Sequence, residues 1–222
     1  MERRQFLLSG SALALLGLSG CSQGLRYNLT EAVRRLLTLS SQRALARLMA
    51  PGGFYDSQIA RISLPDSMGK SGSLVTRALM STLLRDRLQK QVNRAAEKGA
   101  ERAAPVIADA ILAVSPEDAA AILKGGGATA TALLQRNMGD ALIGQMLPGV
   151  DEGLKLFDSS VVTEALRLAT GIDFAGLRAD VTRKASDAIF AEMGKEEMAI
   201  RADPQSTRDP VLIAALTAAR AM

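Results

Sequence analysis

LRDRLQKQVNRAAEKGAERAAPVIADAILAV, residues 84–114, decides the fold class of this chain. In its first half, apolar residues recur every four positions on one face of a helix, and polar residues fall on the opposite face. The apolar face comprises Leu84, Leu88, Val92 and Ala96, and the polar face comprises Arg87, Lys90, Asn93 and Arg94. Asp86 and Lys90 add an ion pair at helical spacing. After Pro105, which begins a new helix or kinks the first, a second apolar stripe continues to Val114.

Toward the N-terminus, an apolar stripe at helical spacing predicts a helix that begins at Thr30. The sequence Ala50-Pro51-Gly52-Gly53 ends it, because proline and glycine do not continue a helix cheaply. Residues 54–65 are expected to form a loop in which Ile59, Ile62 and Leu64 allow a short extended piece, and residues 66–114 are expected to be mostly helical.

Toward the C-terminus, Ser115-Pro116 is a strong helix start, because serine caps free backbone amides and proline suits the first turn. Three glycines, residues 125–127, end that short helix. A further helix is expected over about 128–147, ending near Pro148. Later apolar stripes predict an antiparallel hairpin broken at Gly171 and a last helix after Asp209-Pro210. The sequence therefore predicts an all-α single domain, residues 30–222, of about eight or nine helices.

The composition excludes several classes of chemistry. The chain has 222 residues, no histidine and one cysteine. Without histidine there is no Ser-His-Asp triad and no imidazole metal ligand. A single cysteine excludes an intramolecular disulfide, a CxxC redox pair and a four-cysteine zinc site. The formal net charge of +4 is too small to indicate nucleic-acid binding. We expect neither a metal nor another cofactor.

Residues 1–20 have the pattern of a cleaved signal peptide. A short charged start is followed by an apolar run from Phe6 to Leu18, which is too short for a confident membrane-spanning helix. Arg3-Arg4 followed by Gln-Phe-Leu resembles a twin-arginine export signal, although Glu2 stands where that pattern has serine or threonine.

The leader ends in Leu18-Ser19-Gly20-Cys21, which resembles the lipobox of bacterial lipoproteins. The resemblance implies that Cys21 is acylated and becomes the first residue of the mature chain, with 21–29 as a lipidated tether to the membrane. Ser22 after the cysteine, rather than aspartate, implies the outer membrane more than the inner one. The expected address is the periplasmic side of the cell envelope.

Four stretches of the mature chain resemble the bacterial lipoprotein family known as domain of unknown function 4197. They are Phe54 to Pro65, Asn93 to Ile111, Asp118 to Gly126 and Glu196 to Pro204. The resemblance covers nearly all of residues 30–216 and implies a lipoprotein address and an all-α fold. The family has no established activity, so the resemblance assigns no catalytic residue.

Several residues offer chemistry that the sequence leaves open. Ser67 and Lys70 have the S-x-x-K spacing of a serine nucleophile and its base, but no partner motif accompanies them. Glu197 and Arg201, four residues apart, suit either an acid–base site or a surface or inter-helix ion pair, and the ion pair is favoured. Polar groups among Ala-rich turns either line a pocket or satisfy helix ends, namely Asn93, Glu97 and Asp109.

The first functional hypothesis is a lipid-anchored, non-catalytic binding or interaction module. Its partner is either another envelope protein or an apolar ligand held between helices, although ordinary core packing also accounts for the apolar stripes. The alternative is a hydrolase that uses Ser67 and Lys70 or paired carboxylates. Contact with the membrane is expected through Cys21.

Overall fold

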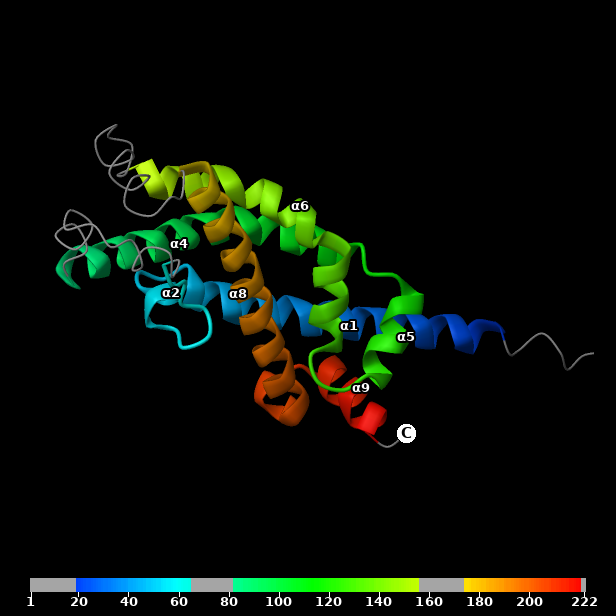
Figure 1. The fold of residues 1–222 in the computed structure, drawn as a ribbon. Coiled ribbons are helices and arrows are strands. Elements are labelled where there is room, and N and C mark those ends of the chain that lie inside the picture. Colours follow the sequence, from blue (N-terminus) through cyan, green and yellow to red (C-terminus); the bar gives the residue numbers. More distant parts are fainter. Residues whose placement is uncertain (1–18, 65–81, 156–173, 221–222) are drawn as a thin grey trace, which may run out of the picture.

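The computed structural model describes residues 19–64, 82–155 and 174–220, and this part of the chain contains helices and no β-strand (Figure 1). The elements are α1 (Ser19–Leu48), α2 (Gly53–Asp56), α4 (Thr82–Leu112), α5 (Pro116–Lys124), α6 (Thr129–Leu154), α8 (Phe174–Ala202), the 3-10 turn η3 (Pro204–Thr207) and α9 (Pro210–Arg220). The predicted all-α fold is confirmed. The helical predictions over 66–81 and over the first arm of the hairpin, from residue 156 to Gly171, lie outside the described residues.

The two long helices α4 and α6 pack closely enough for their backbones to touch. Glycines of α6 face α4: a Cβ atom at Gly149 would overlap the carbonyl oxygen of Lys98, and one at Gly153 would overlap Ala95. Gly99 of α4 likewise has no room for a Cβ atom against α6. This interface is therefore filled by the two helices themselves.

Helix α8 packs against α1, α4 and α6, and Figure 1 shows it lying across them. Side chains from these helices, with α2 and α5, form one apolar core. Its largest fully buried members are Phe54, Leu36, Leu37, Leu48, Ile107, Ile111, Ile122, Leu142, Met146, Leu154, Ile189 and Met193. Burial of each such side chain contributes about 1.5–3 kcal/mol, so packing rather than helix propensity holds the elements together.

Local capping signals are confirmed at three helix ends. Ser115 Oγ accepts a hydrogen bond of 3.1 Å from the Asp118 amide and starts α5, which ends at Gly125 as expected. Asp209 Oδ1 accepts hydrogen bonds from the amides of Val211 and Leu212 and starts α9. Satisfying these free amides fixes where each helix begins.

Two prolines expected to mark helix boundaries lie inside continuous helices. Pro105 lies within α4 and Pro148 within α6, so the prediction that a helix ends near Pro148 is wrong. Both prolines are exposed, so the carbonyl groups that lose a partner, at Glu101 and Gly144, lie on the solvent side. The contact of Gly149 with α4 keeps the chain helical beyond the proline.

Helix α1 begins at Ser19 rather than at Thr30, so residues 22–29, expected as a tether, have helical backbone. Among the residues of α1 whose side chains are described, those that contact the core begin at Leu29. Among the described residues, no helix combines the length and apolar character needed to cross a membrane.

Candidate functional site

A tight turn after α1 brings α2 onto the side of α4. Gly52 has φ of +82°, a left-handed conformation that favours glycine. A Cβ atom at Gly53 would overlap the carbonyl oxygen of Arg47, so the turn also needs a residue without a side chain there. The Gly52 N–H donates a hydrogen bond of 3.0 Å to Oε1 of Glu97 on α4. This bond fixes the start of α2 against α4.

Asn93, one turn before Glu97 on α4, holds the segment that follows α2. Asn93 Oδ1 accepts from the Ile62 N–H at 2.8 Å, and Nδ2 donates to the Ile62 carbonyl at 2.9 Å. The amide thus satisfies both backbone groups of a residue that has no strand partner in the described chain. Asn93 is fully buried, so its predicted place on the polar face of α4 is wrong.

Tyr55 of α2 makes a second connection to α4. Its hydroxyl donates a hydrogen bond of 2.6 Å to Asp86 Oδ1, and Lys90 Nζ lies 2.9 Å from Asp86 Oδ2, which confirms the expected ion pair. The hydrogen bond from Tyr55 lowers the pKa of Asp86 and raises the pKa of Tyr55. The Arg61 guanidinium lies 4.0 Å from the ring centroid, a cation–π distance.

These connections surround a pocket of about 630 Å³ between α2 and α4. Its lining residues are Gly52, Tyr55, Asp56, Arg87, Lys90, Gln91, Arg94 and Glu97. Lys90 is occupied by Asp86, whereas Arg87 and Arg94 are exposed and have no ion-pair partner among the described residues. The volume suits a small molecule, and an unpaired guanidinium suits a carboxylate or phosphate group.

Glu97 forms the inner end of this pocket. Only 8% of the residue is exposed, and burial raises the pKa of its carboxyl group above the ordinary value. The Gly52 N–H and the charge of Arg94 oppose that effect without cancelling it. Glu97 therefore combines a fixed backbone contact with an environment that disfavours its charge.

A family model described as "Protein of unknown function (DUF4197)" matches residues 26–216. The chain belongs to the DUF4197 family. The family expected from the sequence is therefore confirmed, and the match covers every residue that lines the pocket. No curated protein and no solved structure matches the chain.

In this DUF4197 protein, Glu197 and Arg201 join two helix ends. Glu197 is fully buried, and its carboxylate accepts hydrogen bonds from the amides of Ala130 and Thr131 at the start of α6. Arg201 donates a hydrogen bond of 2.9 Å to Glu197 and one of 3.1 Å to the carbonyl oxygen of Ile122, near the end of α5. A negative charge at a helix start and a positive one at a helix end both favour the local dipole. Glu197 and Arg201 do form an ion pair, but it lies within α8 and is buried, and only the hydrogen bonds to Ala130, Thr131 and Ile122 connect it to other helices.

Two more buried carboxylates lie one turn apart on α8. Arg47 of α1 lies 3.4 Å from Glu192 and 2.5 Å from Glu196, and Arg43 lies 3.7 Å from Glu196. Ser57 donates a further hydrogen bond of 2.8 Å to Glu192. The two carboxylates of this DUF4197 chain are thus neutralised by arginines that connect α1 to α8, an arrangement typical of a structural ion cluster.

Of the remaining candidate residues, only Asp109 has a described side chain. Asp109 is exposed on α4 and lies outside the lining. Ser67, Lys70, Arg3 and Arg4 lie outside the described residues, and for Cys21 only the backbone is described. Within the part of the chain that the structure describes, no group of three or more acidic or cysteine side chains is placed to hold a metal ion.

The sequence places Arg87, Lys90 and Arg94 on one polar helix face and pairs Lys90 with Asp86, but it gives the two arginines no role. Their spacing on one face of α4 was readable, but the arrival of Tyr55 and Asp56 opposite them was not. That arrangement depends on the turn at Gly52 and on its contact with Glu97, 45 positions later in the DUF4197 chain.

Proposed function

We propose that this DUF4197 protein is a lipid-anchored protein of the periplasmic side of the envelope that binds an anionic ligand between α2 and α4 without transforming it. One observation carries the binding role: Arg87 and Arg94 line the pocket and have no ion-pair partner among the described residues. Two planar guanidinium groups on one wall match the geometry of a carboxylate or phosphate.

The proposed address rests on the leader sequence. Residues 1–20 read as a signal peptide with Arg3-Arg4 as a twin-arginine-like element, Cys21 is the proposed site of acylation, and Ser22 favours the outer membrane. Helix α1 then runs without a break from Cys21 to Leu48, a rise of about 40 Å. Figure 1 draws α2 at the end of α1 opposite to residue 19, and Tyr55 and Asp56 of α2 line the pocket.

Binding is favoured over catalysis because the three buried carboxylates of α8 already have charged or hydrogen-bonding partners. Glu197 accepts hydrogen bonds from α6, and Glu192 and Glu196 face arginines of α1. A hydrolase that uses Ser67 and Lys70 gains no support from the described residues. The close contact of α4 with α6 at Gly149 and Gly153 argues against an apolar ligand held between those two helices.

The test is equilibrium dialysis of the full-length lipoprotein in detergent against two labelled anions. The probes are inorganic phosphate and a random tripeptide library with acetylated amino ends, which carries a terminal carboxylate. We expect at least one probe to bind, and the R87Q/R94Q variant to bind it at least about tenfold more weakly, which corresponds to about 1.4 kcal/mol.

The matched control is K124Q/R136Q, which also removes two exposed cations without an ion-pair partner among the described residues, but outside the pocket. This control is expected to bind like the wild type. Absence of binding by both probes, or equal binding by wild type and R87Q/R94Q, contradicts the proposal.

A further inference from the structure

The pocket between α2 and α4 also contains negative charge that lacks a partner. Asp56 and Glu97 both line it, and neither carboxylate forms an ion pair among the described residues. The two lie near each other, because the charge of Asp56 contributes to raising the pKa of Glu97. A Cβ atom at Gly52, the residue that Glu97 binds, would lie 2.7 Å from Asp56 Oδ2. We call Asp56 and Glu97 together the acidic end of the pocket.

Asp56 is exposed, and its carboxylate lies near Gly52, the residue before α2. The charge of Arg94 on α4 acts on Glu97 and lowers its pKa, but no ion pair within 4 Å joins Arg94 to either carboxylate among the described residues. Asp86, by contrast, sits against Lys90 at 2.9 Å. The pocket thus keeps unpaired charges of both signs.

The opposite charges are spread along α4. Arg94 precedes Glu97 by three residues in the sequence, and Arg87 precedes it by ten. At a rise of 1.5 Å per residue, the backbone positions of these arginines lie about 4.5 Å and about 15 Å from that of Glu97 along the axis of α4. Three extended peptide residues span at most about 11 Å, which falls between the two values.

We propose that the ligand is a short zwitterion of the class of peptides with free ends, about three residues long. Its amino group is received by Asp56 and Glu97, and its carboxylate by Arg87 and Arg94. This inference rests on the proposed anion-binding function and adds the second charge of the ligand. A simple anion would leave both carboxylates of the pocket facing its own negative charge.

A zwitterionic lipid headgroup shares this chemistry and is the competing source. Its ammonium and phosphate groups are adjacent, whereas Glu97 and Arg87, the outermost charged residues that α4 contributes to the lining, lie about 15 Å apart along the helix axis. The proposed anchor at Cys21 lies at the other end of α1, which also places the pocket away from the anchoring membrane. We therefore commit to the peptide.

The experiment offers the full-length lipoprotein in detergent three random tripeptide libraries in separate dialysis cells. One library has free ends, one has acetylated amino ends and one has amidated carboxyl ends, and bound peptide is measured by mass spectrometry. We expect the free-ended library to bind at least about tenfold more tightly than either blocked library.

Two variants separate the two ends of the pocket. D56N is expected to abolish the preference for a free amino end while keeping the preference for a free carboxyl end, and R94Q is expected to do the reverse. D56N preserves the size of the side chain and R94Q shortens it, both positions are exposed, and circular dichroism of each variant checks folding. The K124Q/R136Q variant should keep both preferences.

Each other outcome overturns the zwitterion proposal in a recognisable way. Equal binding of free-ended and acetylated libraries, with loss in R87Q/R94Q, leaves an anion site and removes the amino-group partner. Binding of glycerophosphoethanolamine, offered in a fourth dialysis cell as the water-soluble lipid headgroup, but of no tripeptide library assigns the site to a lipid. Binding of no probe at all, including inorganic phosphate, removes the anion-binding function as well.

Discussion

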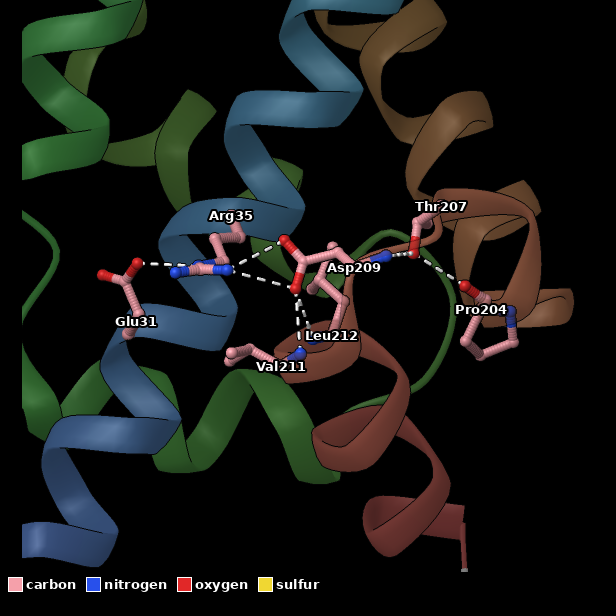
Figure 2. Close-up of polar contacts among 7 residues, drawn as sticks. All are labelled: Glu31, Arg35, Pro204, Thr207, Asp209, Val211 and Leu212. Carbon is pink, nitrogen blue, oxygen red and sulfur yellow. Dashed lines mark hydrogen bonds and ion pairs between the residues drawn. The ribbon is translucent and has the colours of Figure 1, made fainter.

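Arg35 on α1 and Asp209 at the start of α9, 174 positions apart in sequence, form a two-point ion pair that fastens the last helix to the first (Figure 2). Arg35 Nη1 lies 3.2 Å from Oδ1 and 3.1 Å from Oδ2 of Asp209, and Arg35 Nε binds Glu31. The same Asp209 carboxylate caps α9 through the amides of Val211 and Leu212. One side chain therefore both starts α9 and docks it.

Substitutions at Asp209 separate these two roles. D209N keeps a good capping side chain and loses the charge, so we expect a small loss of stability. D209A loses the cap as well, and we expect it to lower the free energy of unfolding by about 0.5–2 kcal/mol more than D209N does. Urea denaturation gives the free energies, and amide hydrogen exchange shows whether the loss is confined to α9. Equal stability of the two variants would show that the cap contributes nothing.

The docking of α9 is expected to fail in acid. Burial raises the pKa of Asp209, but the Leu212 amide, Arg35 and the Val211 amide together outweigh it, and the net pKa lies below the ordinary 3.8. A lowered folded-state pKa means that the stabilisation is present above about pH 3.8 and is lost as the pH falls through the folded pKa. Hydrogen exchange of α9 between pH 5 and pH 2 measures this, with D209N as the control that should lack the acid-dependent step.

Glu197 should be the most sensitive charged residue of the inter-helix contacts. E197Q removes the negative charge that faces both the α6 amides and Arg201, and leaves the Arg201 side chain, only 12% exposed, without its ion partner. Breaking one partner of a buried pair costs about 3–5 kcal/mol. Urea denaturation measures the loss. E101Q is the control, because Glu101 belongs to an exposed pair with Lys98 and its removal should cost far less.

Glycines of α6 provide a test of the α4–α6 packing. G153A places a Cβ atom onto Ala95, so the two helices must separate and stability should fall by about 1–3 kcal/mol. G144A lies on the same helix with nothing within 4 Å of its new Cβ atom, and should gain up to about 1 kcal/mol from helix propensity. Thermal unfolding compares the two variants. A stabilised G153A would mean that α4 and α6 are not in backbone contact.

The predictable part of this fold is its local chemistry. Ser115 and Asp209 were readable as caps because an N-cap side chain binds amides two or three residues away. The sequence at Gly52 predicted the end of a helix, but not the hydrogen bond from the Gly52 N–H to Glu97. In the same way, the burial of Asn93 depends on its hydrogen bonds to Ile62, 31 positions earlier. The prediction of a helix end at Pro148 was wrong because it used local helix propensity alone, whereas the close packing of Gly149 against α4 keeps α6 helical beyond the proline. The pocket depends on such long-range contacts, so the sequence showed its residues without showing that they meet.

Acylation of Cys21 is the prediction that decides where the pocket operates. C21S removes the only thiol of the chain and with it the acceptor for the lipid. We expect the variant to remain an unprocessed precursor without metabolic incorporation of a labelled fatty acid, whereas the wild type incorporates label and loses about 20 residues. Several acyl chains on one residue anchor stably, because each buried CH₂ contributes about 0.8 kcal/mol. Mass spectrometry of the intact protein from the membrane fraction measures both changes.

S22A, which alters the next residue and keeps the thiol, is the control and should still be acylated. A C21S protein that is still cleaved and still partitions into the membrane would place the anchor elsewhere and remove the argument that α1 separates the pocket from the bilayer.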